Sequence, residues 1–243
     1  MTLESQVTVA DNPKAITRVV SSALLGELDL RLTDCMELMR ETPDNAYDLA
    51  IVDPPYVDDF LKLDYATGRK HNCGRAPISR HHISKELHLA PKADYFKELF
   101  RVSKNQIVWG GNYFGLPPSS CWIVWDKDNG EVKFADCELA WTSFKTAVRK
   151  FRFRWAGMLQ GNMAEKEKRI HPTQKPVALY RWLLTKYAKP GQRILDTHMG
   201  SGSIAIACKE AGHPLTACEI DKDYYDQAIE RIKRETQQQR LLT

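Results

Sequence analysis

The sequence predicts an α/β protein whose mostly parallel β-sheet is covered by helices. Short apolar runs alternate with segments of helical periodicity along most of the chain, which is typical of a parallel sheet. The chain has 243 residues, of which 43% are hydrophobic and 27% charged, as in an ordinary globular domain. No internal repeat, low-complexity tract or clear linker divides it. We therefore expect a single domain over residues 1–243.

Each element in the first part of the chain follows from a local pattern. Residues 29–32 and 48–52 are runs of strand length, and residues 35–41 between them have the spacing of a short helix. An amphipathic helix is expected to begin near Pro91, because aromatic and leucine side chains recur after it at helical spacing. Further strands are expected at 107–109, 121–125, 138–144 and 150–155.

Helices and strands alternate more regularly in the C-terminal part. A helix is expected after Pro176, and Pro190-Gly191 breaks it. Asp221 is a suitable cap for the last helix. Between these two helices the pattern predicts a strand at 192–195, a helix at 202–211 and a strand at 215–218.

Basic residues are concentrated in two segments of a nearly neutral chain. Residues 145–175 hold nine Lys or Arg and two Glu, a net charge of +7. Residues 65–85 hold five Lys or Arg and no acid. Such segments favour a polyanionic partner, although solvated loops have the same composition.

The remaining composition favours a cytoplasmic protein. The segment from Met1 to Asp11 is polar and lacks a signal-peptide pattern, and no stretch reaches a membrane-spanning length. The six cysteines are scattered without a CxxC pair, as expected for reduced thiols. We expect no contact with a membrane.

The tetrapeptide Asp53-Pro54-Pro55-Tyr56 follows the expected strand 48–52. Each proline fixes its own φ, favours an extended predecessor and offers no N–H. The carboxylate and the backbone carbonyls only accept hydrogen bonds, so a flat ligand with an NH2 group could donate to both while stacking on Tyr56. The pattern predicts a site for a base amine; a plain strand-ending turn is the alternative.

A glycine turn, Asp196-Thr197-His198-Met199-Gly200-Ser201-Gly202, lies between an expected strand and helix. Glu219 ends the next strand, where an acid can bind the hydroxyls of a ribose. The turn matches neither the dinucleotide fingerprint nor the P-loop, and Asp196 disfavours a diphosphate. S-adenosylmethionine, which has a ribose and a positive centre but no phosphate, fits this arrangement.

A third motif, His171-Pro172-Thr173-Gln174-Lys175-Pro176, stands just before an expected helix. Thr173 and Lys175 are suited to hold an anionic group such as the carboxylate of a cofactor. A helix entry with a capping threonine is the alternative interpretation.

Together the three motifs strongly resemble those of the DNA amino-methyltransferases. The catalytic motif precedes the cofactor motif, as in the β group of that family, which is usually specific for adenine N6. The resemblance covers about residues 30–232. It implies a Rossmann-like, mostly parallel seven-stranded sheet with helices on both faces and loop insertions for DNA recognition.

The resemblance also assigns roles to residues around the cofactor. Asp34-Cys35 stands where an acid of the family meets the cofactor's adenine. Thr197-His198-Met199 departs from the family pattern of Pro-Phe and a small residue, so the aromatic wall for the cofactor is expected to be either weaker or replaced by His198. The implied cofactor-binding residues are Asp34, Cys35, Thr173, Lys175, Asp196, Thr197, His198, Gly200, Ser201, Gly202 and Glu219.

The implied reaction transfers a methyl group from S-adenosylmethionine to adenine N6 in double-stranded DNA. Asp53 and the Pro54 carbonyl would accept the two N–H bonds of the amine, Tyr56 would stack on the base, and Pro55 would stiffen the loop. The base must be flipped out of the duplex to reach such a pocket. No metal and no covalent enzyme intermediate is required.

Two segments are expected to contact DNA. A basic insertion at 57–90 follows the catalytic motif, and residues 145–170 are a candidate target-recognition segment. The alternation in 150–155 predicts aromatic side chains facing inward and a cationic row facing outward; an edge strand protected by charge is the alternative. Expected DNA contacts are Arg69, Lys70, Arg75, Arg80, Lys150, Arg152 and Arg154.

Other interpretations remain open. A cytosine-N4 DNA methyltransferase, an RNA adenine methyltransferase and a non-catalytic DNA-binding module share most of these features, whereas a small-molecule methyltransferase has no use for the basic segments. The protein is expected to act as a monomer or homodimer in a bacterial cell or as a phage product. The spacing of His71, Cys73, His81, His82 and His88 matches no standard zinc finger, so no metal is expected.

Overall fold

The computed structural model describes residues 21–24, 27–55, 90–130, 135–156, 159–164 and 166–240. Tyr56, nearly all of the 57–90 insertion and the five His and Cys residues within it lie outside the described residues. So do the expected DNA contacts Arg69, Lys70, Arg75 and Arg80. Within the described ranges no helix is long and apolar enough to cross a membrane.

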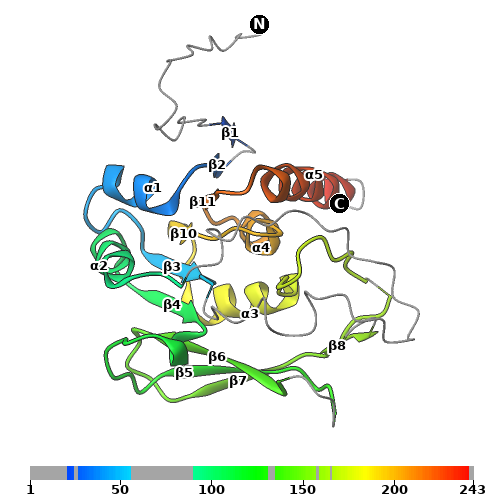
Figure 1. Ribbon diagram of the computed structural model, residues 1–243. Coiled ribbons are helices and arrows are strands. Elements are labelled where there is room, and N and C mark those ends of the chain that lie inside the picture. Colours follow the sequence, from blue (N-terminus) through cyan, green and yellow to red (C-terminus); the bar gives the residue numbers. More distant parts are fainter. Residues whose placement is uncertain are drawn as a thin grey trace, which may run out of the picture.

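One large, mostly parallel sheet forms the centre of the molecule (Figure 1). Its strand order is β1-β2-β11-β10-β3-β4-β6-β5-β7, and the five strands from β2 to β4 run parallel to one another. The bounds in that order are Ser21–Leu24, Leu28–Leu32, Leu215–Glu219, Ile194–Asp196, Leu49–Val52, Gln106–Trp109, Cys137–Thr142, Trp122–Asp126 and Arg149–Arg152. A separate two-stranded sheet pairs β8 (Trp155–Ala156) with β9 (Leu159–Gln160).

Helices cover both faces of the sheet, so the molecule has three layers (Figure 1). Helices α1 (Cys35–Glu41) and α2 (Ala93–Val102) lie on one face. Helices α3 (Val177–Tyr187), α4 (Ser203–Ala211) and α5 (Lys222–Arg240) lie on the other. The expected α/β class with helices on both faces is confirmed.

The inner strands are apolar because both of their faces are buried. All four residues of β3 are buried: Leu49 and Ile51 join the core under α3, α4 and α5, while Ala50 and Val52 join the core under α1 and α2. Aspartates begin two of the helices. Asp34 Oδ1 accepts from the Met36 backbone N–H at 2.7 Å, and Asp221 Oδ1 does the same for Asp223 at 2.8 Å.

Three details differ from the sequence prediction. The described part of the sheet has nine strands rather than seven, because β1 and β7 each add an edge strand to seven inner strands. The expected strand 150–155 is split into β7 and β8, because the chain leaves the edge of the large sheet after Arg152. Beyond it, a short antiparallel partner, β9, lies in the candidate target-recognition segment.

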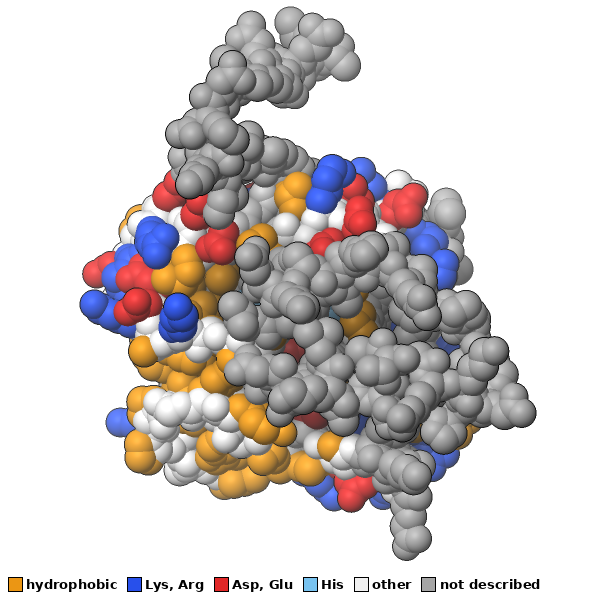
Figure 2. All heavy atoms as spheres, viewed as in Figure 1, with side chains coloured by type: hydrophobic (Ala, Val, Ile, Leu, Met, Phe, Trp, Pro, Cys, Tyr) orange, Lys and Arg blue, Asp and Glu red, His pale blue; other side chains and the backbone are white. Residues whose placement is uncertain are grey.

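The face of the molecule seen in Figure 2 carries no single dominant charge where residues are described. Acidic and basic side chains are interspersed over the end formed by α1, and apolar side chains dominate the lower part of this face, over β5 and β6 (Figures 1 and 2). The described residues on this face therefore form no extended basic surface.

The backbone at Gly111, just after β4, is packed closely against Trp141. A Cβ added there would come within 2.9 Å of the Trp141 backbone nitrogen and closer still to its Cβ, whereas a Cβ at Gly115 would meet nothing within 4 Å. We expect Gly111→Ala to lower the free energy of unfolding by about 1–3 kcal/mol, the usual effect of overpacking. Gly115→Ala is the matched control and should change it by less than about 0.5 kcal/mol. Equal urea midpoints for the two variants would contradict the packing described.

Candidate active site

Four carboxylates meet where parallel strands end. Asp34 follows β2, Glu219 ends β11, Asp196 ends β10 and Asp53 follows β3, and these strands are consecutive neighbours in the sheet. Parallel strands place their carboxyl ends at one edge, which is where ligands bind in sheets of this kind. Asp196 interacts electrostatically with both Asp53 and Glu219. The catalytic and cofactor motifs of the sequence therefore converge in space.

Asp53 has one occupied and one unoccupied carboxylate oxygen. Its Oδ2 accepts a hydrogen bond from the Lys175 ammonium at 2.5 Å. Its Oδ1 is buried and has no hydrogen-bond partner among the described residues. Burial raises the pKa of Asp53, and the neighbouring Lys175 opposes that rise. An unpaired acceptor in a buried position is costly, so Oδ1 is poised for a donor from a ligand.

Lys175 is itself buried between two carboxylates. Only 3% of its side chain is exposed, and its ammonium lies 3.1 Å from Glu138 Oε2 as well as beside Asp53. Glu138 also contacts Lys127, at 2.6 Å. The sequence analysis missed Glu138 and Lys127; the available signal was a glutamate within the otherwise mostly apolar strand β6.

The glycine turn wraps around the end of β10. Gly200 and Gly202 both have positive φ, at 51° and 73°, a conformation that glycine adopts without steric penalty. The Gly200 N–H donates to Glu219 Oε2 at 2.9 Å, which ties the turn to β11. Asp196 Oδ1 accepts from the His198 N–H at 3.0 Å. Burial, with added repulsion from Asp53 and Glu219, raises the pKa of Asp196 to about 8 despite that hydrogen bond.

Thr197 and His198 form the part of the turn nearest α2. The Thr197 hydroxyl lies 2.6 Å from the Tyr95 hydroxyl and 2.9 Å from His198 Nδ1. The rings of Tyr95 and His198 meet edge to face, with centroids 5.5 Å apart. Burial lowers the pKa of His198 to about 4, so the imidazole is uncharged at neutral pH. A neutral flat ring thus stands where the sequence analysis expected His198 to replace an aromatic wall.

The motif from His171 to Pro176 crosses the glycine turn. A Cβ on Gly200 would lie 3.8 Å from the His171 ring, and that ring packs against Tyr224 on α5 at 4.4 Å between centroids. The Thr173 hydroxyl lies 3.0 Å from His171 Nδ1. Thr173 is therefore joined to the turn through the His171 ring, and its part in binding an anion stays a prediction. Lys175 instead points to Asp53 and Glu138, so the two residues predicted to share one anion are turned to different groups.

Asp34 and Cys35 lie beside the strand that ends at Glu219. The Thr33 N–H donates to the Glu219 carbonyl at 3.0 Å, which fixes this proximity. Burial, reinforced by Asp34, raises the pKa of the Cys35 thiol to about 12. The thiol is protonated at neutral pH and lacks the reactivity of a nucleophilic cysteine.

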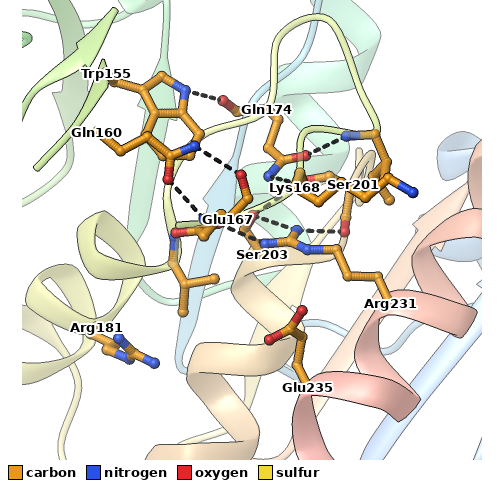
Figure 3. A network of polar contacts seen from close by, with 12 residues as sticks. Trp155, Gln160, Glu167, Lys168, Gln174, Arg181, Ser201, Ser203, Arg231 and Glu235 are labelled. Carbon is orange, nitrogen blue, oxygen red and sulfur yellow. Dashed lines mark hydrogen bonds and ion pairs between the residues drawn. The ribbon is translucent and has the colours of Figure 1, made fainter. Parts of the chain in front are cut away.

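A buried arginine on α5 donates hydrogen bonds to the glycine turn and the first residue of α4 (Figure 3). Arg231 on α5 donates to the Ser201 carbonyl and to the Ser203 hydroxyl, both at 2.9 Å, and to Glu167 Oε2 at 2.7 Å. Glu167 Oε1 in turn accepts from the Val177 N–H at the start of α3, at 2.9 Å. One arginine thus connects the turn, α5 and the segment that leads into α3.

The candidate target-recognition segment joins the same network. The Gln160 side-chain amide exchanges two hydrogen bonds with the Glu167 backbone, each at 2.8 Å (Figure 3). The side-chain Oε1 of Gln174 accepts from the Ile170 N–H at 2.9 Å. The backbone carbonyl of Gln174 accepts from the Trp155 indole N–H at 2.8 Å. The described part of residues 159–170 is therefore hydrogen-bonded to the motif from His171 to Pro176.

The alternation in β7 and β8 has the orientation that the sequence predicts. Phe151, Phe153 and Trp155 pack on the core, and Lys150, Arg152 and Arg154 are exposed. The cations are partly neutralised, because Lys150 pairs with Asp126 at 3.3 Å and both arginines pair with Asp128. Their contact with DNA stays a prediction.

Comparison with known sequences gives a family match. Residues 84–230 match the model of a family described as DNA methylase, of the N6/N4 methyltransferase type. The type II methyltransferase M.HpaI of Haemophilus parainfluenzae is 24% identical over 249 residues, covering 86% of this chain and 76% of its own length. YubD of Escherichia coli (strain K12), a candidate methylase, is 26% identical over 228 residues, covering 84% of this chain and 91% of its own.

Solved structures show the same fold. The cytosine-N4-specific PvuII DNA methyltransferase superposes with a TM-score of 0.53 at 13% identity, covering 86% of this chain and 90% of that one. A proposed DNA modification methylase from Thermus thermophilus, complexed with S-adenosyl-L-methionine, gives a TM-score of 0.50 at 16% identity, covering 85% and 93% of the two chains.

Arg231 provides a stability test of the network in Figure 3. Arg231→Met removes the charge of a side chain of which 3% is exposed and leaves the partly buried Glu167 without this counter-ion. We expect the free energy of unfolding to fall by about 3 kcal/mol. Arg234→Met, on the same helix with an exposed side chain paired to Glu235, should change it by less than about 0.5 kcal/mol. Indistinguishable denaturation curves for the two variants would refute the bridging role.

Proposed function

We propose that this chain, which belongs to the DNA methylase family of the N6/N4 type, methylates the N6 amine of adenine in double-stranded DNA with S-adenosylmethionine as the methyl donor. The observation that carries the proposal is Asp53 Oδ1, a buried carboxylate oxygen without a hydrogen-bond partner among the described residues. It lies at the edge of the sheet that also holds the glycine turn. A base amine is a donor of suitable size and polarity for it.

The chemical problem is the weak nucleophilicity of the amine, whose lone pair is delocalised into the purine ring. Asp53 Oδ1 and the Pro54 carbonyl would accept its two N–H bonds, and this favours a tetrahedral nitrogen with a localised lone pair. Positive charge would then develop on the nitrogen as its bond to the methyl carbon forms and the carbon–sulfur bond of the donor breaks, and the methylated amine would lose one proton to solvent. The ionised Asp53 stabilises that charge electrostatically, and Lys175 favours the ionised form despite burial.

The residues at the neighbouring strand ends fit S-adenosylmethionine, which supplies an electrophilic methyl group on a sulfonium centre. The glycine turn, Glu219 and Asp34 would bind its nucleoside part, and Thr173 lies near the turn for the carboxylate. The turn contains the buried carboxyl group of Asp196 and is not a phosphate cradle. His198, neutral at physiological pH, adds a flat surface that does not repel a cation.

The DNA contacts are proposed on charge and position. Lys150 and Arg152 on the edge strand β7 and Arg154 just beyond it face solvent. Their three positive charges exceed the two negative charges of Asp126 and Asp128 by one. Phosphates would compete with these two aspartates for the cations. A base in a duplex would have to flip out to reach Asp53.

Asp53→Asn keeps the shape of the side chain and removes its charge. We expect the rate of methyl incorporation into duplex DNA to fall at least about 10³-fold, as when a preorganised electrostatic partner is lost. Binding of S-adenosylmethionine, measured by titration calorimetry, should change by no more than a few-fold. Asp44→Asn, which alters a surface pair with Arg101, serves as the control. Wild-type turnover by Asp53→Asn would overturn the assignment.

The nucleic-acid substrate is tested with matched acceptors. Duplex DNA and single-stranded RNA of the same sequence should differ, with methyl incorporation confined largely to the DNA. Faster methylation of the RNA would favour the alternative of an RNA adenine methyltransferase. Binding to DNA without turnover, with the donor bound, would favour a non-catalytic module.

A further inference from the structure

The ion pair at Asp53 is one end of a longer row of charges. Lys175 lies between Asp53 and Glu138, and Glu138 lies between Lys175 and Lys127. The row therefore alternates negative, positive, negative, positive. Its two cations also lie over indole rings, Lys175 at 5.2 Å from Trp109 and Lys127 at 5.4 Å from Trp125.

The sheet topology explains why Glu138 reaches the catalytic edge. β6 runs antiparallel to β4, so residues near its beginning lie beside the carboxyl end of β4. Glu138 is the second residue of β6, and its register partner on β5 is Trp125. Lys127 directly follows β5, which ends at the same edge. A reversed strand thus brings an acid behind Lys175 that no parallel strand could bring there.

The row is built for charge rather than for packing alone. Burial opposes ionisation of Glu138, but Lys175 and Lys127 outweigh it and lower the pKa of that carboxyl. Glu138 in turn raises the pKa of Asp53, where burial is the largest influence and Lys175 acts in the opposite direction. The negative charge on Glu138 therefore offsets part of the effect by which Lys175 lowers the pKa of Asp53.

We propose that Glu138 is a positioning residue for methyl transfer, which with Lys127 holds the Lys175 ammonium between two carboxylates and so leaves Asp53 Oδ1 free for the amine. With Asp53 as its only carboxylate partner, the ammonium could bridge both oxygens of that group and compete with the substrate. Glu138 prevents this by taking one side of the ammonium. The inference rests on the proposed function and deepens it.

Two single variants should shift the ionisation of Asp53 in opposite directions. Glu138→Gln removes a negative neighbour, so the pKa of Asp53 falls and the carboxylate persists to lower pH. Lys127→Met removes a positive charge that offsets Glu138 and that lowers the pKa of Asp53, so the pKa of Asp53 rises. The double variant Glu138→Gln/Lys127→Met should lie near the wild type. The other titratable groups that interact with Asp53 in the described residues are Tyr180 on α3 and Asp196 on β10, and both are unchanged in all variants.

The experiment measures Asp53 itself and then its activity. Carboxyl ¹³C NMR of the full chain, with the Asp53 signal assigned by its loss in Asp53→Asn, gives the titration of Asp53 without any cofactor. Methyl transfer to duplex DNA gives kcat, KM and the acid limb of the pH profile. We expect Glu138→Gln to lower kcat about 10- to 100-fold, the range typical for loss of an outer partner. Its KM for S-adenosylmethionine should stay within about twofold, because the contacts of Glu138 in the described structure are with Lys175 and Lys127 and not with the glycine turn.

The controls separate the possible failures. Glu98→Gln, which alters a pair with Arg101 on α2, should leave the titration, the kcat and the pH profile unchanged. An Asp53 titration that is the same in the wild type and Glu138→Gln would overturn the inference, and so would an unchanged kcat in a variant with a shifted titration. A kcat loss that merely follows a lower melting temperature, with the pH profile unmoved, would also overturn it. Absence of methyl transfer by the wild-type chain would refute the proposed function instead.

Discussion

The site depends on the burial of several carboxylates at one edge of a sheet. The parallel strand order forces Asp53, Asp196 and Glu219 together, and without counter-charge they would repel one another and take up protons. Lys175 is the buried cation that limits this at Asp53, and its contact distance of 2.5 Å makes it part of the site rather than a neighbour. Burial raises the pKa of Asp196, for which the described residues supply no cation in direct contact.

Two largely buried ion networks hold this edge of the sheet. Arg231 fastens the glycine turn to the start of α3 through Glu167, and Glu138 with Lys127 stands behind Lys175. Buried ion pairs add little net stability compared with apolar packing, but removal of one partner is strongly destabilising. Their value here is geometric, since each fixes backbone or charge that faces the pocket. The segment around Gln160 is joined to the first network, so a candidate recognition element and the cofactor turn are mechanically linked.

The local features of this fold could be predicted from the sequence because their signals are local. The helix at Cys35–Glu41, the strand before Asp53 and the glycine turn each follow from a few adjacent residues. The alternation of inward and outward side chains around Phe151 also follows from adjacent residues. Edge strands such as β1 carry a weak pattern, and the split between β7 and β8 depends on where the chain leaves the sheet.

The partners of the catalytic residues could not be predicted in the same way. The contact of Lys175 with Asp53 joins residues 122 positions apart, and that of Arg231 with Glu167 joins residues 64 positions apart. Sheet order and the reversal of β6 decide such contacts, and neither is visible in a short motif. For that reason the motif considered alone predicts an anionic ligand for Lys175, and the sequence predicts no role for Glu138.

The central claim is that a methyl group is transferred to the exocyclic amine of a DNA base at Asp53. The most direct measurement uses S-adenosylmethionine with a deuterated methyl group, duplex DNA and the wild-type chain, followed by mass spectrometry of the released nucleosides. The account predicts labelled N6-methyldeoxyadenosine. Labelled N4-methyldeoxycytidine would correct the base while preserving the amine chemistry. A label on a ring carbon, or no label in any nucleoside, would contradict the claim.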